Sequence, residues 1–485
     1  MENLSKGLSW TTLERFSTQF IQLILGIIIA RLVTPEEYGI LGILLIFINI
    51  AQIFIDSGLG SALIYRNKVD AEGLGTVFMF NILISTLFSF AIYVGAPYLE
   101  SFFNIPHLAN YLNACILIIF ANNFIVVPTS ILKIQLAFKS LALANFVSST
   151  FGGIVGVFFA FKGWGVWALV IMTICKSVLA SLLLFYQSKW FPSFSFSRQI
   201  FHELYSYAIK IFSASLITTL VEQLSSFVIG KFLSPFSLGI FTRSNQFANL
   251  PCTSFGQIVT TVLFPSFVNK SKNQDELSKT YHKCLKMIAF VSFPMFIWIA
   301  MLSKPIILLF LTDKWADCII ILQILCIGRI LFLLANVTEQ MLIAIGRSDL
   351  FFVQQLVKMG IKILFLTIGL FFGVIGVAFA EALYNLMQFF ITNHYAKKTM
   401  NINNKKQLYL VLPFMVSAFI SAMPGFFLAE FYDNYVICIL FASIIAVVSY
   451  YLLASKLTDI NILLFPYLHK LGIDKISFIN KRMKQ

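Results

Sequence analysis

The stretch RLVTPEEYGI at residues 31–40 recurs as KFLSPFSLGI at residues 231–240. The two stretches align without a gap, so that Pro35 matches Pro235 and Gly39 matches Gly239. Each of them follows an apolar run that ends in a basic residue. This pattern predicts that the chain builds one kind of helix–turn–helix joint twice, once in each of two repeated halves.

The composition is that of a membrane protein. Of the 485 residues, 59% are hydrophobic and 12% are charged, with a mean hydropathy of +0.87. Soluble proteins carry about 25% charged residues. Apolar runs of about 20 residues, each long enough to cross a bilayer, recur along almost the whole chain. The sequence therefore predicts an all-α polytopic membrane protein with about 14 transmembrane helices.

Breaks at glycine, proline and charged residues delimit the predicted spans. The spans are expected at 11–33, 38–62, 75–98, 108–131, 140–161, 164–186, 205–230, 235–266, 284–303, 317–345, 351–372, 374–396, 407–429 and 434–455. The eighth and tenth spans are long, and we expect them to tilt or bend.

The distribution of basic residues predicts the orientation. If the N-terminus is cytoplasmic, most of the 35 lysines and arginines fall in inner segments and few in outer loops. Such a bias fixes topology, and it places both termini in the cytoplasm. It also explains the net charge of +14 without a nucleic-acid partner.

The doubled joint predicts how the spans are grouped. We expect an N-terminal six-helix bundle at 1–186, a cytoplasmic linker at 187–204 and a second six-helix bundle at 205–396. Two additional spans follow at 397–456, and a basic cytoplasmic tail at 457–485. Because six is an even number, both bundles enter the membrane in the same direction. Such pseudo-symmetric halves commonly flank a central cavity that opens by alternating access.

Polar stripes on four of the spans predict the lining of that cavity. A charge in the hydrocarbon core costs about 2.5–3.5 kcal/mol on insertion scales, so it usually faces a cavity or a partner. The candidate substrate-binding residues are Arg15, Gln22, Lys210, Arg243, Asn249, Lys358 and Lys362. Their cations outnumber Glu14 and Glu222, which are the candidates for ion coupling. A surplus of cations favours an anionic substrate, and phosphate suits arginine best.

Each candidate also has a simpler interpretation. Glu14 and Arg15 can pair with each other, and Lys210 can extend to the cytoplasmic interface. Asp56 is expected to be a helix-end or packing residue. The sequence carries no motif for an enzyme, a nucleotide, a metal or another cofactor, and its seven cysteines form no CxxC pair.

Several blocks of the sequence resemble a known family. The blocks are WTTLERFSTQFIQLILGIIIARLVTPEEYGILGI (10–43), FIDSGLGSALIYRN (54–67), FVIGKFLSPFSLGIFTRSNQFANLP (227–251) and LFPSFV (263–268). They resemble Wzx-type polysaccharide flippases, and more narrowly the WzxC-like lipopolysaccharide and exopolysaccharide exporters. The resemblance covers the first twelve spans and is weak in the last two.

The resemblance implies membership of the multidrug/oligosaccharidyl-lipid/polysaccharide (MOP) exporter superfamily. Members have two six-helix lobes around a central cavity. Relatives turn undecaprenyl-diphosphate-linked oligosaccharide from the inner to the outer leaflet of the bacterial inner membrane, for O-antigen or exopolysaccharide synthesis. The resemblance further implies transport driven by an ion or proton gradient. Polysaccharide polymerase or assembly proteins are expected as partners. One departure is Ser225, which stands where many relatives have an aspartate.

Three alternatives remain open at this point. A lipid II flippase of the MurJ type would share the cationic cavity. A MATE-like cation or drug antiporter would need an acidic, aromatic cavity, which the surplus of cations disfavours. A membrane polymerase or glycosyltransferase would need a large outer loop, and the predicted outer loops are short.

Overall fold

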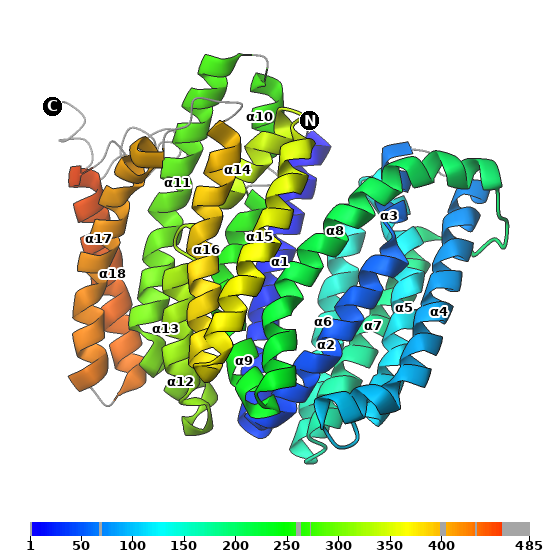
Figure 1. Ribbon diagram of the computed structural model, residues 1–485, viewed down its shortest axis with the longest axis horizontal. Coiled ribbons are helices and arrows are strands. Elements are labelled where there is room, and N and C mark those ends of the chain that lie inside the picture. Colours follow the sequence, from blue (N-terminus) through cyan, green and yellow to red (C-terminus); the bar gives the residue numbers. More distant parts are fainter. Residues whose placement is uncertain are drawn as a thin grey trace. The chain divides into compact units, whose positions relative to one another are not determined.

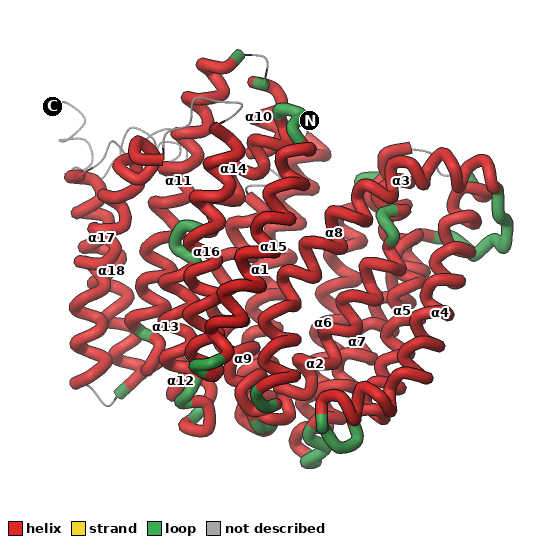
Figure 2. The backbone as a smooth tube through the Cα atoms, viewed as in Figure 1, coloured by secondary structure: helices red, strands yellow, loops and turns green. Residues whose placement is uncertain are grey.

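The computed structural model describes residues 2–66, 70–258, 263–271, 273–397, 404–431 and 434–457. The side chains of residues 2–16 and of a few other positions lie outside this description. Within the described ranges every regular element is a helix (Figure 2). The predicted all-α class is therefore confirmed. The predicted tail at 457–485 lies, apart from Leu457, outside the described residues.

The chain forms two compact units, Met1–Thr242 and Arg243–Gln485 (Figure 1). The helices of the first unit are α1 (Glu2–Leu32), α2 (Pro35–Asp56), α3 (Leu59–Arg66), α4 (Ala71–Phe103), α5 (Leu108–Ile134), α6 (Phe138–Phe161), α7 (Val166–Ser188), α8 (Arg198–Phe232) and the start of α9 (Pro235–Ile258). The second unit continues with α10 (Phe264–Lys270), α11 (Gln274–Met301), α12 (Ser303–Leu311), the 3-10 helix η2 (Asp313–Trp315), α13 (Cys318–Gly328), α14 (Phe332–Ala344), α15 (Ser348–Leu370), α16 (Gly373–Lys397), α17 (Asn404–Phe431) and α18 (Tyr435–Leu457).

Within the described residues, every predicted span overlaps one or two helices. Among the described residues, eleven spans are long and apolar enough to cross a membrane, with α2 and α3 forming one of them. The pair α13 and α14, bent by 40°, makes a twelfth if it is counted as one span. The predicted bend in span 317–345 is thus confirmed. The two remaining predicted spans are α1, whose described apolar part is Ser17–Leu32, and α9, which is rich in polar residues.

The outer surfaces of both units carry large apolar side chains. Examples are Phe90 on α4 and Ile444 on α18, whose exposed fractions are 66% and 62%. Exposed apolar surface on this scale is not found on soluble monomers, but it suits contact with lipid tails. We conclude that the chain is a multi-pass membrane protein.

In the first unit, α8 belongs to the N-terminal core. It packs across α2, α3 and α4, and Leu204 and Ala208 join a core with Leu63, Phe78 and Trp190. The contacts therefore divide the chain at Thr242, inside α9, and not in the segment 187–204. The predicted division into two six-helix halves follows the repeat in the sequence, and it stays a prediction.

In the second unit, the last two helices are part of the main core. Phe414 of α17 and Tyr450 of α18 are buried among side chains of α11 and α14. The Tyr450 hydroxyl donates a hydrogen bond to the carbonyl oxygen of Phe290, at 2.6 Å. The helices that the sequence suggests as an addition to the repeat are therefore integral to this unit.

Candidate functional site

The two copies of the repeated joint meet in the structure. A Cβ atom built on Gly39 would overlap the backbone carbonyl of Pro235, and one built on Gly239 would overlap that of Pro35. The Gly239 Cβ would also lie 3.0 Å from the backbone nitrogen of Gly39. Glycine is the residue that permits such close backbone approach. We call this contact of α2 with α9 the glycine crossing.

Both joints start their second helix in the same way. Thr34 accepts a hydrogen bond from the backbone N–H of Glu37, and the Glu37 carboxylate accepts one from the N–H of Thr34 at 2.7 Å. This is a capping box. In the other joint, the Ser234 hydroxyl accepts from the N–H of Ser237 at 3.1 Å. A proline follows each cap, at the first position of the helix, where its missing N–H costs nothing.

Two candidate cavity lysines lie inside the second unit, on α15, and each has a carboxylate partner. The Lys358 ammonium contacts the carboxylate of Glu339 on α14. The Lys362 ammonium lies 3.0 Å from the carboxylate of Glu381 on α16. The lysine side chains are only 1% and 2% exposed. These two pairs thus join α15 to both neighbouring helices and neutralise its charge.

A closed ring of hydrogen bonds joins four helices next to these pairs. The Tyr281 hydroxyl of α11 lies 2.7 Å from the hydroxyl of Thr338 on α14, which donates to Asn393 Oδ1 on α16 at 3.4 Å. Asn393 Nδ2 donates to Gln407 Oε1 on α17 at 2.7 Å, and Gln407 Nε2 donates back to the Tyr281 hydroxyl at 2.9 Å. Each side chain is at most 1% exposed. The sequence does not predict this ring, because nothing in single spans shows that four separate polar residues face one another.

The other candidate residues are spread over both units. Gln22 of α1 donates a hydrogen bond to the hydroxyl of Ser149 on α6, at 3.2 Å. Lys210 and Glu222 are exposed on α8, and Asn249 is half-buried on α9. Glu14 and Arg15 belong to α1, but their side chains lie outside the described residues. Whether these residues share one cavity stays a prediction.

Two buried arginines of the second unit contact side chains of α9. Arg243 is 3% exposed, donates to Gln246 and places its guanidinium 5.4 Å from the centre of the Phe247 ring. Arg329 lies at the break between α13 and α14 and donates to the side-chain oxygen of Asn245. Arg329 is not among the residues that the sequence predicts for the cavity. The signal for it is an arginine in the middle of a long apolar run that bends.

Comparison with known proteins identifies the family. Residues 28–320, more than half of the chain, match the family model described as "Polysaccharide biosynthesis protein". The teichuronic acid biosynthesis protein TuaB of Bacillus subtilis is 27% identical over 360 residues, covering 72% of this chain and 73% of TuaB. The lipopolysaccharide biosynthesis protein WzxC of Escherichia coli is 22% identical over 427 residues, covering 86% of each chain.

Solved structures show which fold the chain shares. The lipid II flippase MurJ, in an inward closed conformation, superposes with a TM-score of 0.76 at 18% identity, covering 92% of this chain and 98% of MurJ. An inward-facing multidrug transporter of the MATE family and MOP superfamily gives 0.61 at 17% identity, covering 80% and 98%. The fold is thus the one common to lipid II flippases and MATE transporters. From the family match and this fold together, the chain is a member of the polysaccharide biosynthesis protein family.

Proposed function

We propose that the protein is a flippase for undecaprenyl-diphosphate-linked oligosaccharide. It moves these units from the inner to the outer leaflet of the bacterial inner membrane, for lipopolysaccharide or exopolysaccharide synthesis. The observation that carries the proposal is the family match over residues 28–320, in a chain with the fold of a lipid II flippase. The relatives TuaB and WzxC are named for the synthesis of surface polysaccharides.

Alternating access is the proposed mechanism. A large polar headgroup must pass between two halves while its lipid tail stays in the bilayer, so the halves have to rock against each other. The glycine crossing supports this mechanism, since at Gly39 and Gly239 the two joints meet backbone to backbone with no side chain between them. Cations of a central cavity, with Arg15 and Arg243 foremost, would hold the diphosphate.

The balance of buried charge in the second unit narrows the choice of substrate-binding cations. Lys358 and Lys362 are matched by Glu339 and Glu381, and leaving one member of a buried ion pair without its partner is costly. We therefore propose that these two lysines hold α15 in place, and that the arginines bind the substrate. This reassigns two of the seven candidates.

Location and partners form part of the same proposal. The chain would lie in the bacterial inner membrane with both termini in the cytoplasm, work without covalent chemistry, and pass its product to polysaccharide polymerase or assembly proteins. A lipid II flippase is the second candidate, because the fold matches MurJ with a TM-score of 0.76.

The sidedness of lipid-linked oligosaccharide in spheroplasts tests the function. A deletion strain would be complemented with wild type, with Arg15→Gln plus Arg243→Gln, or with Arg347→Gln as a control. Arg347 pairs with Asp349 on an exposed surface, so its loss removes a charge away from the spans. We expect oligosaccharide trapped in the inner leaflet in the deletion strain and the double variant, and normal export with the wild type and the control.

Two outcomes would change the conclusion. Normal sidedness of the oligosaccharide in the deletion strain contradicts the flippase proposal, and trapped lipid II in its place supports the second candidate. Rescue by the double variant, at equal expression, keeps the function but removes Arg15 and Arg243 from the substrate site.

A further inference from the structure

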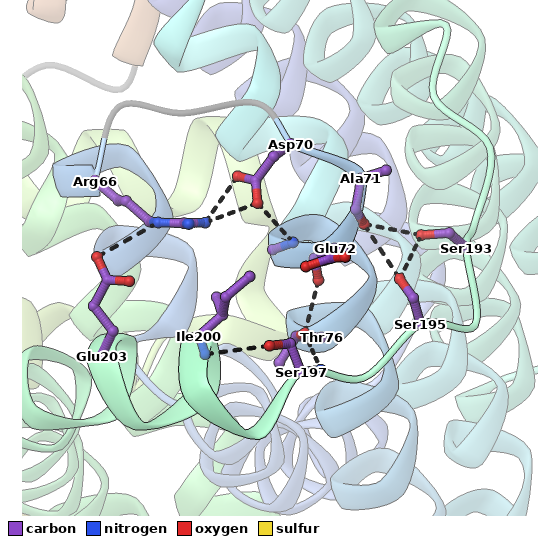
Figure 3. A network of polar contacts seen from close by, with 11 residues as sticks. Arg66, Asp70, Ala71, Glu72, Thr76, Ser193, Ser195, Ser197, Ile200 and Glu203 are labelled. Carbon is purple, nitrogen blue, oxygen red and sulfur yellow. Dashed lines mark hydrogen bonds and ion pairs between the residues drawn. The ribbon is translucent and has the colours of Figure 1, made fainter.

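The segment between α7 and α8 is extended, and its residues 193–197 alternate between serine and phenylalanine. Residues 189–197 read KWFPSFSFS and carry no helix. The Ser193 hydroxyl donates to the carbonyl oxygen of Ala71 at 3.0 Å, and the N–H of Ser197 donates to the Thr76 hydroxyl at 2.9 Å. Figure 3 shows these serines turned toward the first turns of α4. One side of the segment is therefore fastened to α4.

The fit between the segment and α4 is close. A Cβ atom on Gly75 would lie 2.8 Å from the carbonyl oxygen of Ser193. Beside it, Arg66 of α3 bridges Asp70, at 2.8 Å, and Glu203 of α8, at 3.6 Å (Figure 3). The serine contacts hold the segment against α4, and the Arg66 bridge holds α3 and α8 beside it.

Three phenylalanines of the segment are largely exposed, although each ring also contacts another aromatic ring of the first unit. Phe191, Phe194 and Phe196 have exposed fractions of 80%, 75% and 54%. Successive residues of an extended chain point to opposite sides, so Phe194 and Phe196, which alternate with the serines, face away from α4. Phe191 precedes this alternation and is exposed in its own right. Three exposed aromatic rings on a fixed segment form an apolar patch of the kind that marks an interaction surface. We call these three side chains the phenylalanine patch.

Two observations indicate what covers the patch. Leu182 and Tyr186 on the last turns of α7, 61% and 81% exposed, lead directly into it, and α7 is one of the spans that must contact lipid. Lys189 and Arg198 at the two ends of the segment are exposed, and residues 186–202 contain no aspartate or glutamate. Aromatic rings with flanking cations suit the boundary of a membrane that carries anionic headgroups.

We propose that residues 189–198 lie in the interfacial layer of the bilayer and bind anionic phospholipid. The phenylalanine patch inserts among the upper parts of the acyl chains, and Lys189 and Arg198 contact lipid phosphates. The segment that joins the two halves in the sequence is thereby bound on one side to α4 and on the other to the membrane. This inference concerns the lipid surface and is independent of the transported substrate.

Nitroxide accessibility measures the depth of the patch directly. The full chain, with its seven cysteines replaced by alanine, would be labelled at Phe194→Cys, Ser195→Cys or Asp349→Cys and placed in nanodiscs containing phosphatidylglycerol. Asp349 serves as the aqueous reference, because its side chain is 60% exposed and charged. We expect the label at 194 to collide at least threefold more with oxygen than with a nickel chelate. The label at 349 should collide more with the nickel chelate than with oxygen. The label at 195 should be immobile.

A second measurement keeps the native cysteines. Titrating phosphatidylglycerol into the purified protein in detergent should raise the Tm of wild type by several degrees. We expect at least half of this rise to be lost in Lys189→Gln plus Arg198→Gln, and to be kept in Lys397→Gln plus Lys456→Gln, which removes two exposed cations elsewhere. Preferential collision of the 194 label with the nickel chelate overturns the proposal and assigns the patch to water or a protein partner. An equal Tm rise in both charge variants overturns the role of the two cations.

Discussion

Gly39 and Gly239 occupy equivalent places on the two sides of one helix crossing, each against the backbone carbonyl of the other joint's proline. The Pro-x-x-x-Gly spacing explains why each joint contacts the other in the same way. In each helix the proline carbonyl lies one turn before the glycine, so each joint offers one bare surface and one carbonyl. The motif found twice in the sequence is therefore two halves of a single contact.

Alanine at either glycine should separate the helices. Gly39→Ala or Gly239→Ala forces backbone shifts, and overpacking of this kind typically costs about 1–3 kcal/mol. We expect a lower Tm in detergent and slower oligosaccharide export. Gly95→Ala in α4 is the matched control, because a Cβ there meets nothing within 4 Å and the helix should gain about 0.5–1 kcal/mol. Alanine variants at 39 and 239 as stable as the control would show that the crossing is not tightly packed.

Removing one member of a buried ion pair should cost more than removing both. Glu339→Gln leaves the Lys358 ammonium buried without its partner, which typically costs about 3–5 kcal/mol. We expect Glu339→Gln plus Lys358→Met to recover most of the Tm, since an apolar side chain replaces the charge in the same space. Thermal unfolding of the wild type and of these two variants measures this.

The same double variant separates packing from substrate binding. If Lys358 only holds α15 against α14, the double variant should keep oligosaccharide export near the wild-type level. A protein of normal Tm whose export is lost would instead return Lys358 to the substrate-binding residues.

The hydrogen-bond ring should respond to the loss of a single oxygen. Tyr281→Phe removes the group that accepts from Gln407 and contacts Thr338, and an unpaired buried polar group costs about 1–3 kcal/mol. We expect Gln407→Leu combined with Tyr281→Phe to cost less than the sum of the two single changes. Tyr409→Phe, at a 73% exposed tyrosine of α17, should leave the Tm unchanged. Additive losses would indicate that the two side chains act independently.

Reporter fusions test the predicted topology. Alkaline phosphatase should be active when fused after Asn104, between α4 and α5, and inactive when fused after Lys189. A fluorescent protein should show the opposite pattern. The excess of lysine and arginine in the inner segments is the physical reason. Activity at both positions would contradict the assignment of cytoplasmic termini.

The sequence predicts the spans but not which helices pack against one another. Hydropathy is a property of each run alone, so the spans and the bend at 317–345 can be predicted. The partners of Lys358 and Lys362 depend on which helices flank α15. Both partners lie nineteen positions away along the chain, which no pattern within one span reveals. The glycine crossing is unpredictable for the same reason. The repeat predicts two similar joints, but only the folded structure shows that they contact each other.

The ring through Gln407 has a consequence for how the protein is made. Tyr281, Thr338 and Asn393 enter the membrane before α17 is synthesised, so until then they lack the amide that completes their hydrogen bonds. The second unit therefore cannot mature until most of its length has left the ribosome. A nascent chain arrested after α16 would present unpaired polar groups inside the bilayer, and we expect membrane proteases to degrade it much faster than the full-length protein.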